Sequence, residues 1–256
     1  TSVVLVTGAS TSDVVEMIVY DSFAVADTVS AANGGTFTGN MAMGGTLGVT
    51  GTTTIGDGTS GVAKINGGSS SSGQLIFMDA GTNRARIGVP TGTTTLSLSG
   101  SNTLTGDVVI TADGEVTMPT QPAFSAKVNS DQTNVAVGSD VTVVFGAEIY
   151  DVGSNFASNT FTAPVTGKYQ LSFMMYTQAI DSAATYVQMQ ISTSNRGYFI
   201  IFDPDFGQDA TYWTFSLSIL ADMDANDTAI VQYAQSGGSA QTDINGNSYF
   251  TGFLAC

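Results

Sequence analysis

The stretch DVGSNFASNTFTAPVTGKYQLSF, from Asp151 to Phe173, decides the fold class of this chain. Its first part spaces aromatic residues unevenly, and a Pro-x-x-Gly turn follows at 164–167. Apolar and polar residues then alternate strictly up to Phe173. Alternation with a period of two is typical of a β-strand with one buried face. The stretch therefore predicts short strands and tight turns around a core that needs large side chains.

The same alternation recurs toward the C-terminus. Apolar residues occupy every second position in segments 186–191, 212–219, 230–233 and 249–254, and turn-forming residues separate these segments. We expect about ten short strands in this half, which predicts a sandwich or a barrel. No helical period of useful length is found there, so this C-terminal half of the chain is predicted to be all-β.

The composition supports this interpretation and limits the partners. Only 11% of the 256 residues are charged, although 42% are hydrophobic. Low charge with abundant Gly, Ser and Thr indicates β-structure with uncharged outer faces. The net charge is −15, with only six basic residues in the chain. Because phosphate binding requires clustered Lys and Arg, nucleic acid is excluded as a partner.

Cysteine and histidine usage narrows the chemistry further. Cys256 is the only cysteine, so no intrachain disulfide can form, and His is absent, which removes the commonest metal ligand and the usual general base. No apolar run approaches the roughly 18 residues of a membrane span. No signal peptide is visible and the chain begins with Thr1, so we expect a processed protein or a fragment of a longer one.

The chain divides into two halves near Pro119 and Pro122. Of the 30 glycines, 20 lie within residues 1–122, and that half holds only four of the aromatic residues. A compact core needs large side chains, so residues 122–256 are predicted to form the globular head domain. Residues 34–121 are predicted to form a repetitive, thin β-stalk rich in Gly and Thr.

The stalk repeats a short pattern. FTGNMAM at 37–43 matches LTGDVVI at 104–110, and each piece predicts a short strand closed by a Gly or Asx turn. One chain of such strands buries too little surface to be stable alone, so we expect copies from other chains wrapped around a common axis. Residues 1–33 are predicted to form a small β module or the end of an upstream domain.

A denser β island at 62–90 interrupts the stalk. Its pattern predicts a hairpin around Asp79–Asn83. It also holds Lys64, Arg84 and Arg86, half of the basic residues, which we expect to pair with Asp residues between chains. GGSSSSG at 67–73 is predicted to be a flexible loop.

The outer faces of the predicted head strands carry Gln, Thr, Ser and Tyr rather than Lys and Glu. An exposed monomeric sheet normally carries charge that discourages pairing. Uncharged amide and hydroxyl faces with aromatic residues between them favour a buried contact between subunits.

Several motifs of the head occur in a fixed order: Pro122-Ala123-Phe124-Ser125-Ala126, Val144-Phe145, Tyr150-Asp151, Phe156, Phe161-Thr162-Ala163-Pro164, Gly167-Lys168-Tyr169, Phe173 and Phe250-Thr251-Gly252-Phe253-Leu254. In this order they resemble the globular head domain of complement component one-q, a jelly roll of the tumour-necrosis-factor-like superfamily. The sequence departs from that pattern in two places. Only four residues separate Phe156 from Phe161, where the family usually has six, and Leu171 stands where the family prefers Phe. The resemblance implies a jelly-roll β-sandwich head and a homotrimer.

The first half resembles the distal stalk of a tailed bacteriophage fibre, through FTGNMAM, LTGDVVI, ADGEVTMPTQPAF and LIFMDAGTNRARIGV. Gly/Thr β-repeats of this kind also occur in bacterial adhesins. A thin trimeric stalk followed by a trimeric jelly-roll tip is similar to the receptor-binding proteins of tail fibres.

Some phage tips cleave polysaccharides with paired carboxylates. Two clusters qualify: FDPDFGQD, with Asp203, Asp205 and Asp209, and ADMDAND, with Asp222, Asp224 and Asp227. The second cluster is predicted to be a turn between strands. The first could bind a hard cation such as Ca²⁺ through three carboxylates within seven residues, or be a solvated loop. No nucleophile signature is present, so we predict a binding module, with no catalytic residue and no cofactor other than that Ca²⁺.

The sequence therefore predicts a structural virion protein: a homotrimeric tail fibre whose head adheres to a host-cell surface polysaccharide or outer-membrane receptor. Other tail or baseplate proteins would hold its N-terminal end. The alternatives are a structural fibre whose head is only a trimerisation cap, and a secreted or cell-surface bacterial adhesin. Binding is predicted in the 195–213 loop, with Asp181–Thr185 and Gly237–Asn247 as alternatives. The residues proposed for the receptor are Tyr198, Asp203, Asp205, Asp209, Tyr212 and Trp213.

Overall fold

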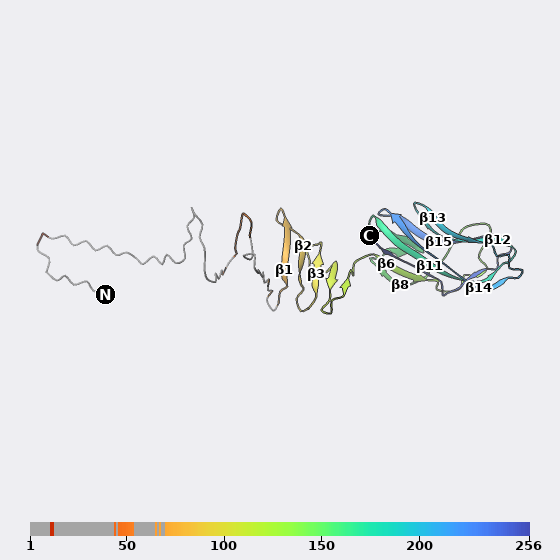
Figure 1. Ribbon diagram of the computed structural model, residues 1–256, viewed down its shortest axis with the longest axis horizontal. Helices are drawn as coiled ribbons and strands as arrows, with labels where there is room; N and C mark the ends of the chain where they lie inside the picture. The colour runs from red at the N-terminus through yellow and green to blue at the C-terminus, as the bar shows by residue number, and fades with distance from the viewer. Residues whose placement is uncertain (1–10, 13–43, 45, 54–64, 66, 68–69) are drawn as a thin grey trace, which may run out of the picture. The chain divides into compact units, whose positions relative to one another are not determined.

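The computed structural model describes residues 11–12, 44, 46–53, 65, 67 and 70–256 (Figure 1). The chain forms two compact units, 1–63 and 64–256. The described residues of the first unit contain no strand, and most of the predicted module at 1–33 and the repeat at 37–43 lie outside the described residues. No helix occurs anywhere in the described ranges, and accordingly none there is long and apolar enough to cross a membrane.

Five strands of the second unit form a sheet in chain order, each antiparallel to the next. They are β1 (Gly73–Asp79), β2 (Thr82–Val89), β3 (Leu96–Ser99), β4 (Val108–Ile110) and β5 (Val116–Thr117). The predicted hairpin is confirmed, because β1 and β2 pair around a turn in which Ala80 and Gly81 adopt positive φ angles of 47° and 78°. The denser region does not end near residue 90, however, since β3 to β5 extend the same sheet to Thr117.

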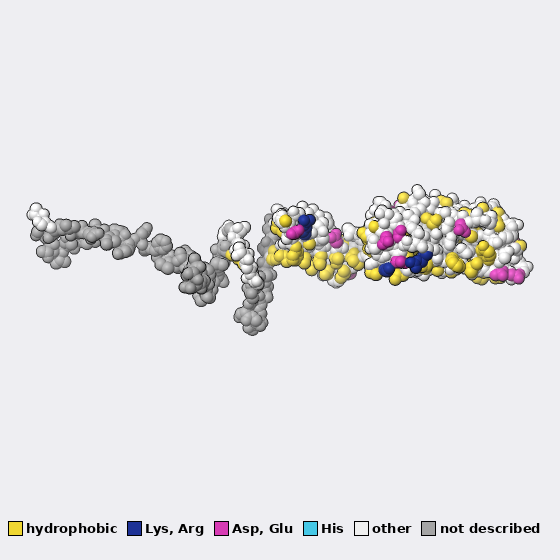
Figure 2. Space-filling model, turned by 90° about the horizontal axis from the view of Figure 1, so that it is seen from above, with side chains coloured by type: hydrophobic (Ala, Val, Ile, Leu, Met, Phe, Trp, Pro, Cys, Tyr) yellow, Lys and Arg dark blue, Asp and Glu magenta, His cyan; other side chains and the backbone are white. Residues whose placement is uncertain are grey.

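The two faces of this sheet differ in polarity. Figure 2 shows hydrophobic side chains gathered over one side of it and basic and acidic side chains on the other. Arg84 forms an ion pair with Asp79 of the same hairpin at 3.4 Å, and Arg86 donates to the Gln74 side-chain oxygen at 2.8 Å. Both arginines therefore find partners within the chain, where we had expected Asp residues of other chains. Lys64 lies outside the described residues.

The remaining strands form two antiparallel sheets, which we call the β11 sheet and the β12 sheet. The β11 sheet contains β14 (Ala210–Met223), β11 (Gly167–Ile180), β17 (Tyr249–Leu254), β6 (Ala123–Lys127) and β8 (Ala147–Val152), with β16 (Asp243–Ile244) beside β11. The β12 sheet contains β13 (Gly197–Phe202), β12 (Ala184–Thr193), β15 (Thr228–Gly237), β10 (Thr160–Thr162) and β9 (Phe156–Ala157), with β7 (Val141–Thr142) beside β15. The predicted all-β sandwich is confirmed (Figure 1).

The stretch that predicted the fold supplies the centre of the core. Tyr169, Leu171 and Phe173 alternate along β11 and are buried, as are Phe156 and Phe161 on β9 and β10. Phe124 of β6 lies between the rings of Phe156 and Phe161, stacked on both at centroid distances of 5.0 and 4.7 Å. The aromatic residues therefore join the two sheets.

Strand register fixes which loops share an end of the sandwich. Gly167 pairs with Met223, and Tyr169 pairs with Leu254, so the first strand of the head begins and the last one ends at what we call the entry end. At the other end of β11, Ile180 pairs with Ala210 and Gln178 pairs with Asp243. This distal end carries three loops, at 181–183, 203–209 and 238–242.

Candidate functional site

The carboxylate of Asp209 ties the three distal loops together. It accepts hydrogen bonds from the Ser182 amide at 3.0 Å, the Ser182 hydroxyl at 2.9 Å and the Gln241 side-chain amide at 2.8 Å. The backbone hydrogen bond from Ser182, supported by the Gln241 and Ser182 side chains, holds the pKa of Asp209 below its usual range. Asp209 therefore positions the loops in its ionised form.

Buried polar side chains hold the same loops from beneath. Asp181 accepts from the Ala183 amide at 2.8 Å and from the Ser239 amide. Gln235 accepts from the Tyr233 hydroxyl at 3.0 Å and donates to the carbonyl oxygens of Gly237 and Ser239, each at 3.0 Å. A binding surface on these loops would be preorganised, because its backbone is already fixed by hydrogen bonds.

An aromatic cluster opens beside the Asp209 loop. Phe202, at the distal end of β13, stacks on Trp213 at 5.7 Å with an interplanar angle of 16°, and Phe206 stacks on the same indole at 5.3 Å and 17°. Phe215 anchors the cluster in the core. Trp213 and Phe206 keep 43% and 44% of their surface exposed. Large aromatic surfaces that stay open to solvent in a preformed loop are typical of binding sites.

A cavity of about 420 Å³ lies along this segment, and we call it the distal pocket. Its lining is the continuous run Phe206, Gly207, Gln208, Asp209, Ala210, Thr211, Tyr212 and Trp213. It combines aromatic rings with amide, hydroxyl and carboxylate groups. Such a mixture suits a ligand with both apolar faces and hydroxyl groups.

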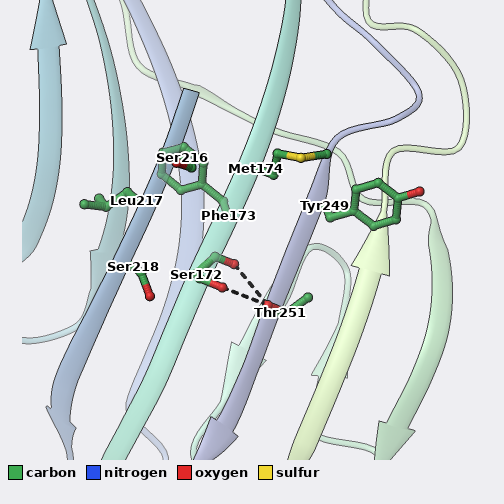
Figure 3. A pocket seen from close by; sticks show the side chains of 8 residues that line it. All are labelled: Ser172, Phe173, Met174, Ser216, Leu217, Ser218, Tyr249 and Thr251. Atoms are coloured by element: carbon green, nitrogen blue, oxygen red, sulfur yellow. Dashed lines mark hydrogen bonds between the residues drawn. The ribbon is translucent and has the colours of Figure 1, made fainter. Parts of the chain in front are cut away.

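A second cavity, of about 430 Å³, lies on the β11 sheet and is shown in Figure 3. It lies over the neighbouring strands β14, β11 and β17. Across its floor, the Ser172 and Thr251 hydroxyls share a hydrogen bond of 2.9 Å. The side chains that point away from the core on these three strands include no charged group through the central rows: Gln170, Ser172, Met174, Ser216, Ser218, Leu220, Tyr249, Thr251 and Phe253. We call this surface the sheet face.

The sheet face has the composition of a subunit contact. Leu220 and Phe253 are 56% and 49% exposed in the single chain, and Met174 lies between them and the distal end. Charged residues are depleted at the cores of protein interfaces, and aromatic residues and Met are enriched there. Part of the uncharged outer surface noted in the sequence therefore lies on the β11 sheet as the sheet face, and Gln188, Gln190 and Gln232 carry another part on the β12 sheet.

The predicted site residues separate into three groups. Asp209, Tyr212 and Trp213 line the distal pocket. Asp203 and Asp205 lie exposed in the same loop, where the Asp203 carboxylate accepts from the Asp205 amide at 3.2 Å. Tyr198 packs against the core near the entry end of β13, away from the pocket.

The three aspartates do not assemble as a metal site. In the ranges that the structure describes, no group of three His, Cys, Asp or Glu side chains could hold a metal ion. The Asp209 carboxylate is taken up by Ser182 and Gln241 instead. Asp222, Asp224 and Asp227 lie at the entry end, where Asp222 pairs with Arg196 at 3.1 Å and Asp227 caps the predicted turn.

Sequence reasoning missed Phe206 and placed Phe202 only beside the acidic loop, outside the proposed site residues. Both stand in FDPDFGQD, whose carboxylates are its more conspicuous feature. The signal that could have found them is the spacing of three aromatic residues, Phe202, Phe206 and Trp213, around one loop. The two alternative segments, Asp181–Thr185 and Gly237–Asn247, reach the same end of the sandwich as the favoured loop.

The fold and these surfaces define a jelly-roll β-sandwich of the kind that associates with itself and binds ligands. The C1q domain model matches residues 123–255, more than half of the chain, so the chain belongs to the C1q domain family. Domains of this class form homotrimers, which supports self-association of this chain, and they are typically structural or binding domains, usually extracellular or secreted.

Two solved structures are similar to the head. The globular domain of zebrafish complement 1qA protein has 17% identity and a TM-score of 0.42, over 53% of this chain and 98% of that one. A crystal structure of murine APRIL at pH 8.0 has 11% identity and a TM-score of 0.39, over 52% of this chain and 98% of that one. A comparison with curated proteins gave no match.

Proposed function

We propose that the chain is the distal part of a homotrimeric bacteriophage tail fibre whose head attaches to carbohydrate on a host-cell surface. The head would comprise residues 122–256 and the stalk residues 34–121, with tail or baseplate proteins holding the N-terminal end. The observation that carries the binding role is the distal pocket, in which Trp213 and Phe206 stay exposed beside a loop network fixed by Asp209.

Carbohydrate is the ligand class that this pocket suits best. A sugar ring has an apolar face that stacks on an aromatic ring and a rim of hydroxyls that need hydrogen-bond partners. Trp213 and Phe206 offer the stacking surface, and Gln208, Thr211 and the exposed Asp205 offer donors and acceptors. Because the loop is preorganised, little conformational entropy is lost when the sugar binds.

A homotrimer would present three copies of the pocket to one surface. Individual sites for surface sugars can then be weak, since linked sites raise the overall avidity without new contacts. The stalk would separate these sites from the particle. This arrangement favours an attachment protein over the secreted adhesin, which stays the alternative of the same binding class.

The second candidate function, a trimerisation cap without a ligand, is favoured by the uncharged sheet face. Binding to a panel of bacterial cells and purified surface polysaccharides separates the two functions. We expect the wild-type protein to bind at least one of them and Trp213→Ala to weaken that binding by about thirtyfold, the loss typical of an interface hot spot.

Phe199→Ala is the matched control, because Phe199 is an exposed aromatic residue on β13 whose side chain faces away from the core. It should bind as the wild type does. Solution mass is measured for every variant. If Trp213→Ala loses the homotrimer, the aromatic cluster is a contact between subunits and not a ligand site. If the wild type binds no polysaccharide and no cell, the second candidate function, the trimerisation cap, is favoured.

A further inference from the structure

The five-stranded sheet β1–β5 has one face that is apolar throughout. Register places the alternate residues of neighbouring strands opposite one another, so Leu75 faces Ile87, Ile87 faces Leu98, and Leu98 faces Val108. The same face continues through Ile110 to Val116. The complete set is Leu75, Phe77, Ala85, Ile87, Val89, Leu96, Leu98, Val108, Ile110 and Val116. We call it the apolar face.

Part of the opposite face, along β2 and β3, is covered by the chain itself. The Gly106 amide donates to the Ser99 hydroxyl at 2.7 Å, and the Gly100 amide donates to the Asp107 carboxylate at 2.6 Å. Asn102 of the same 100–107 loop accepts from Asn83 at 3.0 Å and from Arg86 at 3.3 Å. Ser97 and Ser99 are consequently buried.

The apolar face has no such cover within the described part of the chain. Phe77 keeps 47% of its surface exposed and Val116 keeps 62%. A single sheet with one apolar face needs a second layer, because a monomeric protein rarely leaves a contiguous apolar surface of this extent in water. Arg86 lies on the opposite face, and Arg84 pairs with Asp79 beside the hairpin turn, so covering the central part of the apolar face would desolvate no charge.

We propose that the apolar face is an interface between copies of this chain, in which three β1–β5 sheets pack face to face around a common axis. The proposal rests on the homotrimer of the proposed function. Only residues 118–122 separate β5 from β6, and five residues span at most about 18 Å. The three heads of a homotrimer would therefore hold the three β1–β5 sheets close to one another, within reach of the roughly 10 Å at which sheets pack face to face.

The occupant of the face can be identified by a photo-crosslinker in the full-length protein. Benzoylphenylalanine is placed at Phe77, on the apolar face, or at Met78, the neighbouring residue on the opposite face. Both side chains are exposed in the single chain, so they are a matched pair. We expect irradiation to give products of two and three chain masses from position 77, mapped to residues 73–117 of another copy, and several times less product from position 78.

Equal yields at the two positions would overturn the proposal, as would cross-links from position 77 to residues 1–63 of the same chain. Solution mass is measured on the same samples before irradiation. A trimer without intermolecular product at position 77 overturns this interface and leaves the proposed function standing, whereas a monomer overturns both. Proteolysis of segment 73–117 gives a second test. Val116→Lys places a charge on the apolar face and should speed the cleavage, whereas Thr117→Lys, on the opposite face, should not. The same rate of cleavage for both variants would contradict the interface.

Discussion

Replacing Phe124 by Ala should destabilise the head more than the replacement of any exposed residue does. Phe124 is 1% exposed and contacts three other rings: Phe156 and Phe161 by stacking, and Phe250 edge-on at 4.9 Å. Removing a buried Phe side chain costs about 3–5 kcal/mol, because the transfer free energy is lost and a cavity remains. The three ring contacts place Phe124→Ala at about 4 kcal/mol, within that range.

Thermal unfolding followed by Trp213 fluorescence is a suitable assay, because Trp213 is the only tryptophan. For a domain of this size, about 4 kcal/mol lowers the Tm by roughly 15 °C. Protein concentration must be held constant, since association of subunits also raises the Tm. Val165→Ala, at an exposed apolar residue of the entry end, is the control and should change the Tm by less than about 2 °C. A Tm for Phe124→Ala within about 3 °C of the wild-type Tm would refute this account of the core packing.

Three further predictions concern other parts of the head. Gly252→Ala should lower the stability by about 1–3 kcal/mol in denaturant titrations, because a Cβ atom there would lie 2.6 Å from Leu171 Cδ2 and 2.7 Å from Phe124 Cε1; wild-type stability would contradict the close packing. Burial, with the charge of Asp181, raises the pKa of Tyr233 to about 12 from 10.0, so stability that is present below pH 10 should fall as the pH rises toward 12. Tyr233→Phe should show a smaller alkaline fall in Tm than the wild type, and an equal fall would contradict the assignment. Hydrogen bonds lower the pKa of Asp209, so its contribution to the stability of the distal loops should be present at neutral pH and be lost as the pH falls below about 4. Asp209→Ala should therefore speed hydrogen exchange of the Ser182 amide at pH 7, and unchanged exchange would contradict the loop network.

The fold of the head could be predicted because the patterns that mark its core strands are local in sequence. Tyr169, Leu171 and Phe173 follow a period of two, and the Pro-x-x-Gly turn marks where their strand begins. Each observation depends on neighbours within a few positions, which a sequence displays directly. The hairpin β1–β2 was predictable for the same reason.

The distal pocket was only half predictable. Tyr212 and Trp213 were found because they stand beside acidic residues, but Tyr198 was grouped with them through sequence distance alone. Four residues of strand carry Tyr198 about 13 Å from Phe202, toward the entry end. The role of Asp209 could not be derived either, because its partners Ser182 and Gln241 come from loops 27 and 32 residues away.

The extent of the β1–β5 sheet shows the same limit in the stalk. Strands β3 to β5 have two to four residues each, and their sequences resemble the isolated repeats of the region. Only register shows that Ile87, Leu98 and Val108 lie side by side on one face. A local pattern identifies a strand, but the surface that the strands make together depends on their pairing.

The most direct test of the account is the molar mass of the wild-type protein in solution, by light scattering at micromolar concentration. One chain has a mass of 26.3 kDa, so the homotrimer predicts about 79 kDa, unchanged on tenfold dilution. A mass near 26 kDa would contradict the shared fibre axis and the interface of the β1–β5 sheet together.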